Sequence, residues 1–288
     1  MKDDPETPVT AGHLVARATE LATLPDIYIQ IRQILDNPAS SHADIANALA
    51  TDTALTGRLL RVANSAFYGR PGSISTISAA IGLLGTQQVH DLVLANAVIH
   101  ALEGFSSDLM DRRTFWSTSL FTASAAKILA EQCDILDSER LFVAGLLASV
   151  GLLILCQELP QQMRIILDDA RQPAQDIAAL QRERLGFDHA EVGAKLFSTW
   201  QLPDALVMPI GMHTQPATAK ETRLESSILY IAARLAETHT RQVSLDLLVP
   251  ELSDDAWDTT GMSMEQLRQV ERDARDLTAE LTPLLLAA

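Results

Sequence analysis

The spacing of the apolar residues constrains this chain more than any other feature. Apolar side chains recur every three or four positions along most of its length, which is the period that places side chains on one face of an α-helix. Glycine is scarce, with 13 in 288 residues, and helix-forming residues dominate almost every segment. Only 243–249 resembles a strand, and weakly. The sequence therefore predicts an all-α fold, a multi-helix bundle.

Helix boundaries are marked by capping residues, prolines and glycines. Asn37-Pro38 ends one predicted helix, because a residue before proline is pushed out of the helical conformation. Ser41, three positions before Asp44, predicts the start of the next. Two long helices are predicted at about 114–131 and 139–157, and a Gly186-Phe187-Asp188 turn precedes a helix over 189–200. The Asp-rich stretch before Ser263 is predicted to be a loop.

The charge of the chain limits its partners. It has 22 basic and 37 acidic residues, a net charge of -15, and no basic patch that would attract a nucleic acid or an anionic lipid surface. The longest uncharged run, 141–156, is shorter than the ~20 residues that span a bilayer, so we expect a buried core helix. Cys133 and Cys156 fit neither a disulfide framework nor a metal cluster. We expect a cytoplasmic protein with no nucleic-acid or membrane partner.

The C-terminal part contains one further amphipathic segment. Its apolar residues step by three and four, as in a coiled-coil seam, but for only about two heptads. We expect this segment to pack against the rest of the chain, and the alternative is a homodimer through the C-terminal helices. The residues of this seam are Leu267, Val270, Ala274, Leu277 and Leu281.

A search for standard catalytic motifs finds no phosphate-binding loop, nucleophile elbow, His-Glu-x-x-His or Cys-x-x-Cys. No two of the seven histidines are adjacent or one helical turn apart. His189, at a helix start after Asp188, is a metal ligand, a proton donor or a histidine bonded into the turn. His213, at a helix end, has the same alternatives. The stretch 64–71 is either a rigid turn or a surface for a small molecule.

Several segments together resemble the HDOD domain, a bacterial signalling relative of the HD phosphohydrolases. The most specific is 59–69, Leu-Leu-Arg-Val-Ala-Asn-Ser-Ala-Phe-Tyr-Gly, and others follow in order as far as His213-x-x-Pro216. The resemblance covers 14–216 and implies an N-terminal helical lobe over about 14–105 and an HD-like helical core over about 106–216. Residues 217–288 would form a C-terminal helical extension.

The resemblance also implies where a metal site would lie. Active HD enzymes hold metal with a His, a His-Asp dyad and a further Asp. Here the dyad positions are Ala148 and Ser149, the upstream His is replaced by Thr118, and Met212 stands where a first His precedes His213. His189 matches a family histidine. Since Ala148 has no donor atom and a hydroxyl replaces a carboxylate poorly, we expect no catalytic residue, metal or cofactor.

Three hypotheses about function follow. The first is a non-catalytic regulatory module in bacterial signal transduction that recognises a signalling protein. The second is a phosphohydrolase with a rebuilt metal site, and the third is a small-ligand sensor that uses the vacated pocket around His189 and His213. The interaction surface of the first would be formed by the C-terminal helices or by the turn, whose candidate residues are Asn64, Phe67, Tyr68 and Arg70.

Overall fold

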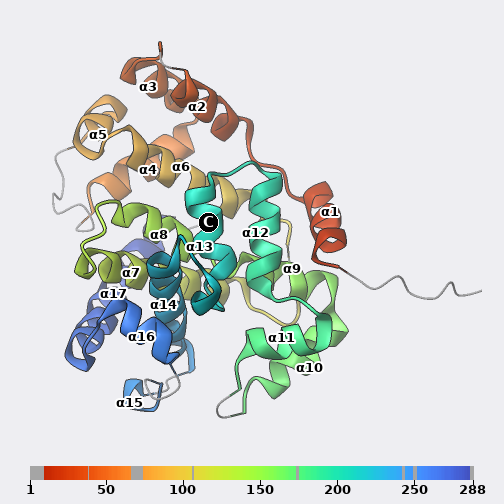
Figure 1. The fold of residues 1–288 in the computed structure, drawn as a ribbon. Helices are drawn as coiled ribbons and strands as arrows, with labels where there is room; N and C mark the ends of the chain where they lie inside the picture. The colour runs from red at the N-terminus through yellow and green to blue at the C-terminus, as the bar shows by residue number, and fades with distance from the viewer. Residues whose placement is uncertain are drawn as a thin grey trace, which may run out of the picture.

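The computed structural model describes residues 10–37, 39–65, 74–105, 107–172, 175–241, 244–248 and 252–285. Within these ranges the chain folds into helices joined by turns and loops, without a β-strand, and Ser107 and Met110 form an isolated bridge (Figure 1). The predicted all-α class is confirmed.

The first six helices precede the central part of the chain. Helices α2 to α6 pack on one another, whereas α1 packs against α9 and α12 (Figure 1). The bounds are α1 (Ala11–Leu21), α2 (Asp26–Asp36), α3 (His42–Ala50), α4 (Thr53–Ala63), α5 (Ile77–Leu84) and α6 (Thr86–Ala101).

The remaining helices form the body of the molecule around α7. Helices α8, α14 and α17 all pack on α7. The bounds are α7 (Arg112–Gln132), α8 (Ser138–Leu147), α9 (Val150–Glu158), α10 (Pro160–Asp169), α11 (Ile177–Leu185), α12 (His189–Thr199), α13 (Asp204–Met212), a short 3-10 helix (Pro216–Thr218), α14 (Arg223–Arg241), α15 (Leu245–Leu248), α16 (Asp254–Thr260) and α17 (Met264–Leu285).

Small residues allow α7 and α8 to approach closely. A Cβ atom at Gly145 would lie 2.8 Å from Ala123 Cα and 2.9 Å from the Thr122 carbonyl oxygen, closer than carbon atoms can pack without strain. Next to this contact, Leu120 and Phe121 are fully buried. The α7–α8 pair therefore forms the centre of the core, and α8 leads directly into the segment where the family places its metal-binding dyad.

The apolar run 141–156 lies in the core, as predicted. The segment Ser138–Glu158 is long and apolar enough to cross a membrane by length and composition, but 78% of its most apolar window is buried inside the protein. A turn at 148–149 separates α8 from α9 within it. Burial against other helices accounts for its apolar composition.

The C-terminal part contains one confirmed prediction of packing and one prediction, of a loop, that was wrong. The seam of α17 packs inside the chain, on α7 and α4, and Leu267, Val270, Ala274 and Leu281 are buried. The stretch 243–249, which resembles a strand weakly, contains the helix α15 in its described part, in agreement with the all-α prediction. The Asp-rich stretch is helix α16, whose first turn contains Asp254 and Asp255, where acidic side chains are favoured by the positive end of the helix.

Candidate functional site

His189 is positioned by the turn between α11 and α12. Gly186 ends α11 in the left-handed conformation, with φ 85°, which favours glycine. Asp188 then caps α12, accepting a 3.1 Å hydrogen bond from the Glu191 N–H. His189 is thus the first residue of α12 and is buried. Its main-chain N–H and its Nδ1 both lie within hydrogen-bond distance of Gln181 Oε1, at 3.0 and 2.8 Å.

His213 approaches His189 from the end of α13. The two imidazole rings meet edge to face, with centroids 5.5 Å apart and planes at 68°. His213 is 2% exposed, and its Nδ1 lies 2.6 Å from the Ile210 carbonyl oxygen. The structure therefore brings together the two histidines that the sequence proposed as a residual pocket.

The hydrogen bonds define which nitrogens carry protons. A carbonyl or amide oxygen accepts, so each Nδ1 donates, and the lone pair of each neutral ring is left on Nε2. Burial, together with the neighbouring His213, lowers the pKa of His189 to about 4. Burial also lowers the pKa of His213. At neutral pH both rings are uncharged bases.

The carboxylate nearest the pair is already bound by other side chains. Asp188 accepts a 2.7 Å hydrogen bond from the Thr214 hydroxyl and forms an ion pair with Arg182. Burial alone would raise the pKa of Asp188, but His189, the Thr214 and Glu191 donors and Arg182 together hold it below its usual value. Asp188 is therefore a bound anion that links α11, α12 and the residue after His213.

The dyad positions lie in the turn between α8 and α9. Gly145, one helical turn before, contacts α7, and Gly151, shortly after, contacts the main chain of His189 and Gly193 in α12. Along the chain, Ala148 and Ser149 therefore lie between a residue that contacts α7 and a residue that contacts α12. Ala148 is fully buried and contributes only a methyl group, and Ser149 is half-buried.

Thr118 and Met212, which stand where the family resemblance implies histidines, form their contacts away from the histidine pair. The Thr118 hydroxyl donates to the Thr114 carbonyl at 2.8 Å, within its own helix. Met212 Sδ accepts a weak contact from the Thr218 hydroxyl at 3.8 Å. Neither is hydrogen-bonded to the histidine pair. Gly145 of α8 packs on the main chain of Thr122, about one helical turn after Thr118 in α7.

These donors do not fit a catalytic metal. A catalytic dication needs at least three protein ligands and an open position for water. The site offers two imidazoles, a methyl group, a hydroxyl and a carboxylate paired with Arg182. In the described part of the chain, no group of three or more His, Cys, Asp or Glu side chains is placed to hold a metal ion.

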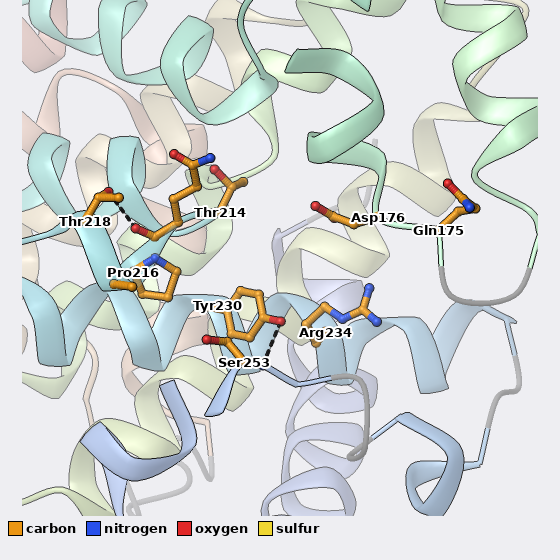
Figure 2. A pocket seen from close by; sticks show the side chains of 10 residues that line it. Gln175, Asp176, Thr214, Pro216, Thr218, Tyr230, Arg234 and Ser253 are labelled. Carbon is orange, nitrogen blue, oxygen red and sulfur yellow. Dashed lines mark hydrogen bonds between the residues drawn. The ribbon is translucent and has the colours of Figure 1, made fainter. Parts of the chain in front are cut away.

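A cavity of about 580 Å³ opens beside Thr214, the residue that follows His213 in the sequence (Figure 2). Its wall includes Thr214, which binds Asp188, and Asp176 and Arg234 lie across from it. The Tyr230 hydroxyl accepts a 3.1 Å hydrogen bond from the Ser253 N–H. Burial raises the pKa of Tyr230, so this hydroxyl is protonated at neutral pH. The cavity is thus lined by neutral and charged polar groups and adjoins the histidine network.

The sequence did not reveal Gln181, Arg182 or Tyr230 as members of this region. Gln181 is a fully buried amide within α11, and its neighbour Arg182 is half-buried. Polar residues inside a helical pattern usually face solvent, so nothing in the spacing distinguished these two. Thr214 was adjacent to a named candidate, and only the structure shows that it holds Asp188.

Of the four candidate residues in the turn proposed as an interaction surface, Asn64 lies within the described part of the chain. Its Nδ2 donates to the carbonyls of Leu60 and Ile74, at 2.8 and 2.7 Å, and its Oδ1 accepts from the Ile74 N–H at 2.9 Å. Asn64 therefore ties together the two ends of the connection from α4 to α5. Phe67, Tyr68 and Arg70 lie outside the described residues.

Solved structures of other bacterial proteins share this arrangement of helices. One, from Shewanella amazonensis and provisionally named a phosphohydrolase, is 26% identical with a TM-score of 0.73, covering 94% of this chain and 97% of that one. Another, from Marinobacter aquaeolei and provisionally named a signal transduction protein, is 21% identical with a TM-score of 0.70, covering 98% and 62%. The fold is that of the HD-like helical domains.

The sequence assigns the family within this class. The HDOD domain profile matches residues 21–216, and the chain belongs to the HDOD domain family. An uncharacterized protein from Treponema pallidum is 24% identical over 212 residues, which are 72% of this chain. The chain spans 40% of that relative's length.

Proposed function

We propose that this chain is a non-catalytic regulatory module in bacterial signal transduction, located in the cytoplasm, that acts by recognising a protein partner. The observation that carries the proposal is the chemistry of the dyad positions. Ala148 and Ser149, in the turn between α8 and α9, offer a methyl group and a hydroxyl in place of the His and Asp that the family resemblance leads us to expect, and Asp188 is paired with Arg182. Such a site lacks the protein ligands that would hold a metal ion and its activated water.

Two further considerations support the regulatory part of the proposal. The HDOD family resembles HD phosphohydrolases but is associated with signalling, and the relative from Marinobacter aquaeolei is provisionally named a signal transduction protein. The net charge of -15 favours a protein partner over a nucleic acid. Recognition would use the surface of the C-terminal helices or of the turn that Asn64 closes.

The decisive experiment compares the metal content of the natural chain with that of a variant in which the dyad is restored. The variant carries Ala148→His and Ser149→Asp. Both proteins are incubated with Mn²⁺ or Fe²⁺, desalted, analysed for metal, and assayed with a phosphate monoester and a phosphate diester. We expect no stoichiometric metal and no hydrolysis for the natural chain, and a gain of metal for the variant.

Tightly bound metal in the natural chain, together with hydrolysis that chelation abolishes, would overturn the non-catalytic proposal. If the variant does not fold, the natural chain alone still decides the matter, because its metal content and activity are measured independently. The single variant Ser149→Asp is the matched control, since it adds a carboxylate without a fully buried imidazole.

A second candidate function is a small-ligand sensor, and the cavity that favours it is lined by Thr214, the residue after His213, and not by the histidine pair itself. Its volume of about 580 Å³ lies within the range of ligand sites in proteins. A ligand there would contact Tyr230 and Thr214, and through Thr214 it would act on Asp188. Such a ligand should raise the melting temperature by mass action, and Tyr230→Phe should reduce that rise. A compound-library screen without any such rise would remove this candidate.

A further inference from the structure

A second and larger cavity lies away from the histidine pair, where α4, α6, α7 and α17 meet. Its volume is about 1020 Å³. Trp116, in its wall, is two positions from Thr118 and so points to a different side of α7. This cavity, called here the arginine groove, joins the N-terminal helices to the end of the C-terminal helix.

The arginine groove contains more positive charges than its carboxylates neutralise. It is lined by Arg58, Arg112 and Arg113 and by two acidic side chains. Glu103 lies 2.6 Å from His100 Nδ1 and 4.0 Å from Arg112. Asp111 caps α7, with 2.7 Å hydrogen bonds from the N–H and the hydroxyl of Thr114. Both carboxylates are therefore already bound.

Arg58 and Arg113 form no ion pair or hydrogen bond within the described ranges of the chain. Arg113 acts on Asp111 only through its field, which adds a minor lowering to the pKa of Asp111 beyond that caused by the Thr114 hydrogen bonds. Both side chains line the arginine groove, and Arg113 also lines a smaller cavity with Thr114 and Thr118. Guanidinium groups bind phosphate and carboxylate oxygens in pairs of hydrogen bonds.

An aromatic and aliphatic wall faces the same cavity. Trp116 is 3% exposed, and its indole Nε1 has no acceptor among the described residues. Ile99, Pro283 and Leu285 complete the apolar part of the lining. A ligand that fits both parts must combine an anionic group with an apolar or aromatic body.

We propose that the arginine groove binds a small organic phosphate, a monoester with an apolar or aromatic substituent. A phosphate monoester carries a charge of roughly -1.5 to -2 at pH 7, which matches the charge of two guanidinium groups. A ligand with a single carboxylate would neutralise only one of them. The strongly acidic surface repels longer polyanions, so the ligand is a small molecule. Binding would connect α4 to α7 through Arg58 and Arg113, and it would favour one arrangement of the N-terminal helices relative to α7.

The test uses phenyl phosphate, inorganic phosphate and phenol as probes, with titration calorimetry on the full chain. The variants are Arg58→Gln and Arg113→Gln. Arg61→Gln is the matched control, because Arg61 lies one turn further along α4 and lines a different cavity with Asn64 and Leu60. Each groove variant should weaken phenyl phosphate about 10-fold or more, as expected for loss of a charge-assisted hydrogen bond, and the control should bind like the natural chain.

Phenyl phosphate should quench tryptophan fluorescence, and Trp116→Phe should lose that quenching. Phenol should not bind, and inorganic phosphate should bind more weakly than phenyl phosphate. Absence of saturable binding, or equal weakening by Arg61→Gln, would overturn the proposal. Equal affinity for inorganic phosphate and phenyl phosphate would overturn the apolar half of it. Melting curves of each variant distinguish loss of binding from loss of folding. The metal analysis of the natural chain is a separate experiment, so failure of the groove proposal leaves the proposed function untouched.

Discussion

The contact between α9 and α12 offers a sharp test of how the histidine site is held. A Cβ atom at Gly151 would overlap the His189 carbonyl oxygen and would lie 2.7 Å from the Gly193 nitrogen. These are main-chain atoms, which cannot rotate out of the way as a side chain would. Gly151→Ala must therefore push α9 away from α12 and move the first residue of that helix, His189.

The expected cost can be estimated from the two opposing effects. Overpacking in a core costs about 1–3 kcal/mol and occasionally more, and the rigid main-chain contact places this case at the upper end. Replacing glycine by alanine inside a helix returns about 0.5–1 kcal/mol. Gly151→Ala should therefore lower the free energy of unfolding by about 2 kcal/mol, and the melting temperature by roughly 4–8 °C.

The same interface contains its own control. A Cβ atom at Gly193 would come no closer than 3.4 Å to the Gly151 nitrogen, an ordinary contact. Gly193→Ala should therefore leave the unfolding free energy within about 1 kcal/mol of the natural value, because the gain in helix propensity offsets slight crowding. Urea unfolding followed by circular dichroism measures both. If Gly151→Ala unfolds like the natural chain, or if both variants lose equal stability, the close contact of α9 with α12 is not as described.

Two more predictions concern the histidine pair and the turn after α4. Because the pKa of His189 is about 4 in the folded protein and 6.5 ordinarily, the unfolded chain gains a proton first as pH falls below 6.5. The free energy of unfolding should therefore fall by about 2 kcal/mol between pH 7 and pH 5. In urea titrations at a series of pH values, His189→Gln should show a smaller fall than the natural chain. An equal fall in both proteins would contradict this. Asn64→Ala removes the side-chain partner of the Ile74 N–H and carbonyl, whereas the Leu60 carbonyl still accepts from the Asn64 N–H, and it should cost about 2 kcal/mol. A change within about 0.5 kcal/mol, typical of a surface site, would show that Asn64 does not close the turn.

The helical fold followed from local patterns, and the errors have local causes. The spacing of apolar residues and the caps at Ser41 and Asp188 place helices where the structure has them. The stretch around Leu245 resembles a strand by composition, but the Ser244 hydroxyl accepts from the Asp246 N–H and begins a helical turn. The Asp-rich segment of α16 appeared to be a loop because acidic residues at a helix start look like solvated polar sequence.

The site was less accessible to sequence because it depends on contacts between distant segments. His189 and His213 could be named individually, but their meeting depends on the packing of α12 against α13. Gln181 fixes the His189 ring from another helix, and a buried amide leaves no periodic signal. Arg182 and Thr214 also bind Asp188 across separate segments, and no sequence motif marks such contacts.

The two histidines still have the arrangement that a metal ligand would need. In metal sites, a coordinating imidazole donates its other N–H to an oxygen acceptor, which fixes the ring and its tautomer. Here Gln181 and the Ile210 carbonyl accept from the two Nδ1 atoms, so the lone pairs lie on Nε2. The chain departs from the pattern that the family resemblance implies at Ala148 and Ser149, in the turn between α8 and α9, and also at Thr118 and Met212. Restoring the dyad should therefore add a His and an Asp to a chain whose two imidazoles each keep the Nε2 lone pair, and an imidazole at the fully buried Ala148 position would cost about 1–3 kcal/mol in crowding. Before metal is added, the double variant should melt below the natural chain, and metal should then raise its melting temperature while leaving that of the natural chain unchanged.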